Sequence, residues 1–213
     1  MMNKDYILRM AEQFGRSLAI ILRLRKSNKY EDSLIYIDDL FLRTTGFTSS
    51  FVNSATEEML LQMISPLGKL NVQKCAWIAL LLKEEGDIYD DMGNEDESYF
   101  RYLKSLHFFL EVAKHTDEAR DIDIPSAIDY DLSVLEAFEL PQETKIRLFK
   151  YFEAAGEYGR AKKWLFEVLN TADGPVDAGV IEQETAFYER MKDKSDDELR
   201  AGGLSRKDVE EGI

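Results

Sequence analysis

Apolar side chains recur every three or four residues along nearly the whole chain. The first such stripe contains Ile7, Met10, Phe14, Leu18, Ile21 and Leu22. This period places apolar side chains on one face of a helix, and a globular protein buries that face. No run of β-branched residues alternates with polar residues between turn signals, which is the pattern of a strand. The sequence therefore predicts an all-α fold.

Capping and turn residues divide this pattern into separate helices. In a capping box, a serine and a glutamate three residues later satisfy the first amides of a helix. Such boxes occur at Ser54 with Glu57 and at Ser195 with Glu198. After the first helix, further helices are expected over residues 30–42, 72–92, 94–114, 126–138, 142–155, 158–170 and 180–192, and loops over 44–53 and 171–179.

Three helix–turn–helix segments share one spacing, in which a turn residue is followed by a small residue and then a large one. The three sets are Asn28, Ser33 and Ile37, then Gly93, Ser98 and Tyr102, then Gly156, Ala161 and Leu165. The small residue lets two antiparallel helices approach closely, and the large residue fills the space beside that contact. Glycine or asparagine at the turn adopts backbone angles that other residues resist. The spacing predicts three similar antiparallel hairpins.

This spacing resembles the tetratricopeptide repeat, a 34-residue helical hairpin. The middle segment matches best, although Glu85 stands where leucine is usual and the closing proline is missing. The resemblance implies antiparallel hairpins stacked as a short right-handed array with a concave surface. The alternative is that any helical hairpin with a small residue at its crossing gives the same spacing.

The chain as a whole also resembles an uncharacterised family of bacterial proteins, mostly from Firmicutes. The resemblance is carried by residues 5–16, DYILRMAEQFGR, and residues 198–204, ELRAGGL. It implies a helical-repeat fold and no known activity. We expect residues 1–194 to form a single helical-repeat domain. Two glycines and a short apolar pattern near the end indicate that residues 195–213 form a C-terminal capping tail.

The charge of the chain narrows the range of partners. Of its 213 residues, 41 are acidic and 27 are lysine or arginine, so the formal net charge is −14. Nucleic acids and anionic membranes need a concentrated positive surface, so we expect neither as a partner. One cysteine excludes a disulfide framework, and two histidines exclude a histidine-rich metal site. The chain has no secretory leader pattern and no membrane-spanning apolar stretch, which predicts a cytoplasmic protein.

Basic residues gather near the first predicted turn. Arg16 lies four residues after Glu12, a spacing for ion pairs on a solvated helix face. Arg23 has no such acid before it, and further basic residues follow. The candidate partner-binding residues are Arg16, Arg23, Arg25, Lys26 and Lys29. Together they predict a surface for an acidic protein or peptide.

Acidic residues gather between residues 84 and 97, a stretch with eight acids and no base. Their spacing does not match a calcium-binding loop. We expect a helical pair surrounded by water. The alternative is that these acids face the basic residues at 25–29, either within the monomer or across a dimer.

No residue pattern points to catalysis. Cys75 has apolar neighbours and no histidine close in sequence, and His107 and His115 are too far apart for one metal ion. A phosphate-binding loop and a serine-hydrolase elbow are both missing. We therefore expect no enzyme activity, no cofactor and no metal, and we predict a non-enzymatic module that binds a protein or peptide. The alternatives are a structural homodimer that uses its own groove, and a small-ligand sensor or enzyme with a pocket between helices.

Overall fold

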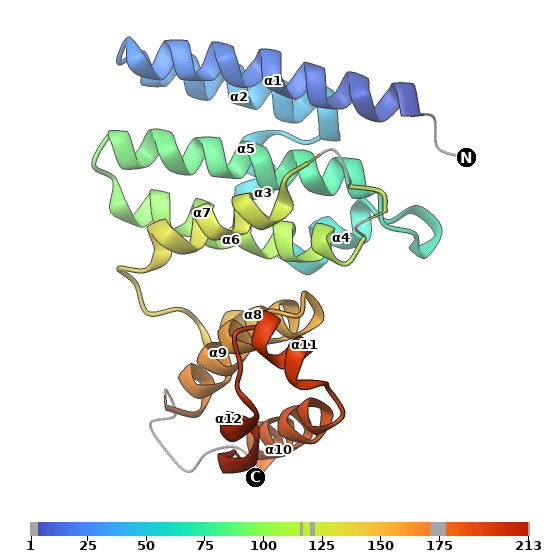
Figure 1. Ribbon diagram of the computed structural model, residues 1–213. Helices are drawn as coiled ribbons and strands as arrows, with labels where there is room; N and C mark the ends of the chain where they lie inside the picture. The colour runs from blue at the N-terminus through green and yellow to red at the C-terminus, as the bar shows by residue number, and fades with distance from the viewer. Residues whose placement is uncertain (1–3, 116, 120–121, 171–177, 213) are drawn as a thin grey trace. The chain divides into compact units, whose positions relative to one another are not determined.

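The computed structural model describes residues 4–115, 117–119, 122–170 and 178–212 (Figure 1). These residues form helices and connecting turns without any strand, which confirms the all-α prediction. The helices are α1 (Lys4–Lys26), α2 (Tyr30–Thr45), α3 (Ser49–Ser54), α4 (Glu57–Met63), η1 (Pro66–Gly68), α5 (Val72–Asp91), α6 (Glu95–Ala113), α7 (Ile124–Leu135), α8 (Gln142–Ala154), α9 (Tyr158–Asn170), α10 (Ala178–Lys192), α11 (Asp196–Ala201) and α12 (Arg206–Glu211). Over the described ranges, no helix is long and apolar enough to cross a bilayer.

The chain divides into two compact units. Unit 1 is Met1–Phe138 and contains α1 to α7, and unit 2 is Glu139–Ile213 and contains α8 to α12. This division lies inside the range 1–194, for which the sequence predicts a single domain. That single domain, with a separate tail at 195–213, stays a prediction.

The predicted hairpins are present as α1–α2, α5–α6 and α8–α9, and all three turn in the same way. Their turn residues all have positive φ, which is 54° at Asn28, 72° at Gly93 and 79° at Gly156. In each turn the next amide donates to the carbonyl five residues before it, at 2.9–3.0 Å. Glycine adopts these angles without strain, and asparagine tolerates them better than most residues. The turn prediction is therefore confirmed at all three positions.

The small residues of the three hairpins are buried. Ser33, Ser98 and Ala161 are each less than 5% exposed, as a small residue between two packed helices must be. In the middle hairpin, a Cβ at Gly86 would lie only 3.0 Å from the ring of Tyr102. The absence of a side chain at Gly86 therefore makes room for that ring between α5 and α6.

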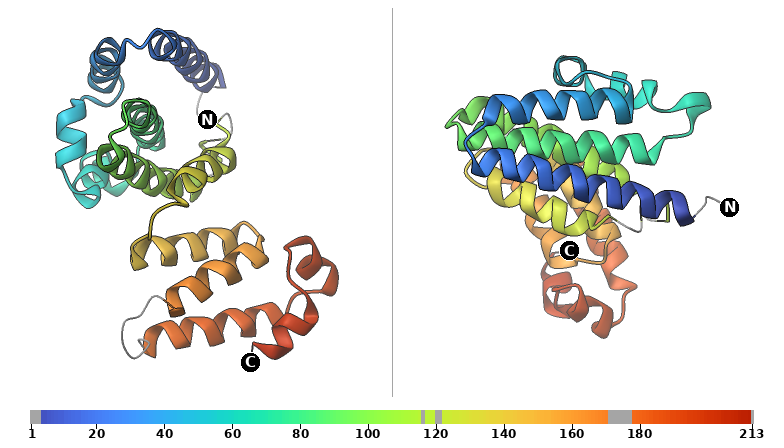
Figure 2. Two further views of the ribbon diagram at one scale, coloured as in Figure 1. Left: turned by 90° about the vertical axis from the view of Figure 1, so that its left-hand side faces the viewer. Right: turned by 90° about the horizontal axis from the view of Figure 1, so that it is seen from above.

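Helix α5 is the centre of unit 1. Figure 2 shows the other helices of the unit curving around it. Its residues 75–82 are all buried, and the buried face continues through Glu84, Glu85 and Asp87 near the end of the helix. A helix that is buried on every side has no solvated stripe for its polar residues. These acids must therefore find partners on neighbouring helices.

The loop predicted over 44–53 is wrong, because α3 begins inside it. Thr48 caps α3 by accepting a hydrogen bond from the amide of Phe51, and the Asp38 carboxylate accepts one from the amide of Ser49 at 2.7 Å. The capping box at Ser54 is also wrong. Thr56 caps α4 instead, while Ser54 is the last residue of α3.

The second predicted capping box is confirmed, since Ser195 and Glu198 satisfy each other's amides at the start of α11. The tail that follows packs within unit 2, where Leu199, Leu204 and Val209 are buried. The Gly159 amide at the start of α9 donates to the Gly202 carbonyl at 2.8 Å. That residues 195–213 act as a cap stays a prediction. The predicted loop over 171–179 lies mostly outside the described residues.

Candidate functional site

The five predicted binding residues lie along α1 and the turn after it, but they do not share one environment. Arg16, Arg23, Lys26 and Lys29 are exposed, whereas Arg25 points inward. Arg16 is 3.9 Å from a carboxylate oxygen of Glu12, and Lys29 is 3.4 Å from one of Asp32. The side chains of Arg23 and Lys26 make no hydrogen bond or ion pair with the residues that the structure describes.

Two apolar side chains, Ile20 and Leu22, are exposed about 160° apart around α1, at the two edges of the band that holds Arg16, Arg23 and Lys26. Ile20 is 44% exposed and Leu22 is 38% exposed, while Ile21 between them is fully buried. We call the set Arg16, Ile20, Leu22, Arg23 and Lys26 the cationic face of α1. The prediction that Leu22 belongs to the buried stripe is therefore wrong. The helical phase explains this, because Leu22 is about 100° around the helix from Ile21.

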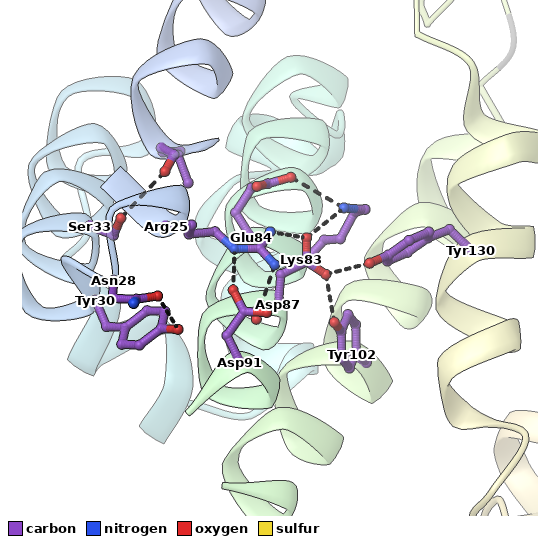
Figure 3. A network of polar contacts seen from close by, with 11 residues as sticks. Arg25, Asn28, Tyr30, Ser33, Lys83, Glu84, Asp87, Asp91, Tyr102 and Tyr130 are labelled. Atoms are coloured by element: carbon purple, nitrogen blue, oxygen red, sulfur yellow. Dashed lines mark hydrogen bonds and ion pairs between the residues drawn. The ribbon is translucent and has the colours of Figure 1, made fainter. Parts of the chain in front are cut away.

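Arg25 joins the basic turn to the acidic run within the monomer. Its Nη1 is 2.8 Å from Oδ2 of Asp87, and its Nε is 2.8 Å from Oδ2 of Asp91 (Figure 3). Burial disfavours the charge of Arg25, but these two carboxylates outweigh burial and raise its pKa. The alternative prediction is that the acids at 84–97 face the basic residues at 25–29 either within the monomer or across a dimer. At Arg25 they do so within the monomer.

Asp87 is the hub of a polar network that links four helices. It accepts hydrogen bonds from the hydroxyls of Tyr102 on α6, at 2.6 Å, and Tyr130 on α7, at 2.7 Å (Figure 3). Lys83 on α5 lies 3.2 Å from it, and Arg25 on α1 completes the set. Burial alone would raise the pKa of Asp87, but these partners lower it below its usual range. Asp87 is therefore ionised and fully paired in the core.

Lys83 balances the acids at the edge of this network. Its Nζ lies 3.2 Å from Oε1 of Glu84 and 4.1 Å from the centre of the Tyr130 ring. The other oxygen of Glu84 is buried and has no hydrogen-bond partner among the described residues, and burial raises the pKa of this carboxyl. Burial also raises the pKa of Tyr130 to about 12, together with its bond to Asp87. Lys83 therefore supplies positive charge to both Glu84 and Asp87 inside the network.

Glu85 binds in the opposite direction, toward α3. Ser49 donates to its carboxylate, and Asn53 Nδ2 donates to it at 2.9 Å. Arg101 on α6 lies 3.5 Å from the same group. The expectation of a fully solvated acidic pair is therefore wrong for Glu84, Glu85 and Asp87. It fits only the later acids of the run, such as Asp90, Glu95 and Asp96, which are exposed.

The other residues considered for chemistry lie in structural surroundings. Cys75 is buried on α5, and burial raises the pKa of its thiol, so the reactive thiolate is disfavoured. His107 on α6 pairs with the carboxylate of Glu57 at the start of α4. Across the described part of the chain, no three His, Cys, Asp or Glu side chains are arranged to hold a metal ion.

Unit 2 contains a pocket of about 290 Å³ between α9 and α10. Its walls include Lys162, Lys163, Phe166 and Tyr188. Lys162 Nζ is already 2.8 Å from the carboxylate of Asp208 on α12. One of the two lysines is therefore engaged within the protein.

These features define an all-helical protein of stacked hairpins, with acids paired inside unit 1 and an outward cationic helix face. The chain belongs to the family described as "Family of unknown function (DUF6483)", whose profile matches residues 1–213. No curated protein and no solved structure matches the chain. The family and the fold thus leave the function to be argued from the surfaces described above.

Proposed function

We propose that the protein acts by binding rather than by catalysis, and that the cationic face of α1 binds an acidic amphipathic segment of a partner protein. One observation carries this proposal. Folding withdraws Arg25 into the Asp87 network but leaves Arg23 and Lys26 exposed beside the apolar Ile20 and Leu22. Such a face, with its cations between two apolar edges, suits a helix whose carboxylates are flanked by apolar side chains.

The charge of the whole chain supports this choice of partner. A protein with a net charge of −14 repels an acidic partner over most of its surface. The cationic face of α1 is where that repulsion is locally reversed. Exposed cations guide association and set specificity, while the two apolar side chains supply area to bury.

We also propose that the three hairpins are degenerate tetratricopeptide-like repeats of a right-handed array in a cytoplasmic bacterial protein. The shared turns at Asn28, Gly93 and Gly156 support common hairpin geometry. Arrays of this kind present extended surfaces to peptides and helices. A solution scattering curve that fits a closed bundle better than a superhelix contradicts the array.

The binding proposal is tested with a fluorescently labelled synthetic helix that repeats glutamate and leucine in each heptad, so that both side chains lie on one face. Binding is measured by fluorescence anisotropy. We expect the wild-type chain to bind it and added salt to weaken the complex. The double variant Arg23→Glu with Lys26→Glu should bind at least about tenfold more weakly, or 1.4 kcal/mol, because two attractions become repulsions. Lys69→Glu is the control, since Lys69 is an exposed lysine of unit 1 outside α1. Equal weakening by the control, or no binding by wild type, contradicts the proposal.

A homodimer is the second candidate, and a different observation favours it. The Arg25–Asp91 ion pair places the basic α1–α2 turn beside the acidic α5–α6 turn on unit 1. A two-fold axis can set each turn against the opposite turn of a second copy. Light scattering at low salt would then show a dimer that dissociates in high salt and in Lys26→Glu. A monomer under all conditions contradicts this candidate and leaves the peptide proposal standing.

A further inference from the structure

Asp131 on α7 is a buried acid that the binding proposal does not use. The residue is 0% exposed, and neither carboxyl oxygen has a hydrogen-bond partner among the described residues. An ionised carboxylate in such a place loses its hydration and gains no donor in return. Burial therefore favours the neutral acid.

The neighbouring hydroxyl does not compensate an ionised Asp131. Ser105 on α6 is the hydroxyl that acts on the Asp131 carboxyl. Its single hydrogen is donated to the backbone oxygen of Ala79 on α5, with Oγ and O 3.0 Å apart. Ser105 Oγ can then accept a hydrogen but has none left to give. Ser105 therefore has no free hydrogen for an ionised Asp131, whose oxygens stay unpaired among the described residues.

The charged groups near Asp131 already pair with other residues. From α5, Asp131 is faced by Lys83, Glu84 and Asp87. Lys83 is shared between Glu84 and Asp87, while Tyr102 on α6 and Tyr130 on α7 both donate to Asp87. Burial, aided by the two neighbouring acids, raises the pKa of Asp131 well above its usual value, against the opposing influence of Ser105 and Lys83.

We propose that Asp131 is held as a neutral acid in the docked α7, and that loss of its proton to solvent releases α7 from α6. Helix α7 packs against α6 and buries Ile124, Ile128 and Leu135. Release of α7 exposes part of the unit 1 core. The protonation state of Asp131 therefore controls whether α7 stays docked, and we call this arrangement the latch. This inference is independent of the binding proposal.

The direction of the pH effect follows from the two states of α7. In the released helix Asp131 meets water and titrates near its ordinary pKa, about 3.9. In the docked helix its pKa is raised. Between these two values only the released state is ionised, so each pH unit favours release by up to about tenfold. Docking is therefore fully stable below the ordinary pKa and is lost as pH rises through the raised one.

Amide hydrogen exchange of the full chain tests this latch. Protection factors in α7, corrected for the base catalysis of exchange itself, are measured from about pH 5 to about pH 8. We expect them to fall in the wild type by up to about tenfold per pH unit and to stay flat in Asp131→Asn, whose amide remains a donor. Asp129→Asn is the matched control, because Asp129 is an exposed acid on the same helix, and it should keep the wild-type fall.

Glu84→Gln separates the second buried acid, since burial raises the pKa of Glu84 as well. A fall that survives in Glu84→Gln and disappears in Asp131→Asn supports the latch, and the reverse overturns it. Flat protection in the wild type also overturns it. If Asp131→Asn does not fold, the side-chain carboxyl ¹³C shift of Asp131 in the wild type decides. A neutral-acid shift that persists well above the ordinary pKa of about 3.9 supports the latch, and a shift that titrates near that value overturns it.

Discussion

Asp87 and Asp91 form a natural pair for measuring what burial does to an ion pair. Both carboxylates lie 2.8 Å from the same guanidinium, that of Arg25. The side chain of Asp87 is 5% exposed and that of Asp91 is 35% exposed. We therefore compare Asp87→Asn with Asp91→Asn, two identical chemical changes that differ in their surroundings.

The expected losses of stability differ because only Asp87 is buried away from water. Exposed ion pairs contribute about 0.2–1 kcal/mol, so Asp91→Asn should cost less than about 1 kcal/mol of unit 1 stability. Removing one partner of a buried pair costs about 3–5 kcal/mol, because the remaining charge is left uncompensated. Asp87→Asn leaves both Arg25 and Lys83 short of a buried counter-charge. It should therefore cost at least about 2 kcal/mol more than Asp91→Asn.

Urea unfolding followed by tryptophan fluorescence measures this difference. Trp77 is buried in α5 of unit 1, so a Trp164→Phe background makes the signal specific to that unit. The pKa of Asp87 is lowered in the folded state, so its contribution is present above the unfolded value and is lost as pH falls through the folded one. The gap between wild type and Asp87→Asn should be constant above about pH 5 and shrink in stronger acid. Equal losses from the two substitutions at neutral pH refute the reasoning.

Three further predictions follow from local features. Leu67 is fully exposed with φ of 58°, so Leu67→Gly should raise the free energy of unfolding by about 1 kcal/mol, whereas Gly68→Ala, at φ of 75°, should lower it in the same urea titration. Truncation after Lys194 should lower the melting temperature of unit 2, because it removes the buried Leu199; an unchanged temperature argues against a capping tail. Cys75 should resist alkylation until the protein unfolds, since burial raises the pKa of its thiol, and rapid labelling of native protein contradicts this.

The hairpins were predictable because their signals are local. A turn residue with left-handed angles, a small crossing residue and a large one beside it all lie within ten positions of one another. Sterics at Asn28, Gly93 and Gly156 then decide the turn without help from distant residues. Periodicity also predicts the long helices well, since one stripe of apolar residues is enough to bury a face.

Short helices and buried acids depend on distant partners and were missed for that reason. α3 has only six residues, and its first amides are satisfied by Thr48 and by Asp38 from another helix. Composition alone favours a loop there. In the same way, Glu85 is buried because Ser49 and Asn53 reach it from α3, more than thirty positions away in the sequence. No local spacing separates it from the exposed acids that follow.

The position of Arg25 around the helix predicts its role better than its place in a cluster of basic residues does. Arg25 lies four positions after the fully buried Ile21, so it shares the inward face of α1, whereas Arg23 lies seven positions after Arg16 on the outward face. A cluster of basic residues is therefore two sets with different partners. The inward arginine neutralises Asp87 and Asp91 within the protein. The chain has 41 acids, so most of its surface repels a negatively charged partner. The exposed cations outside the internal pairing attract such a partner, and binding is therefore proposed at the outward set.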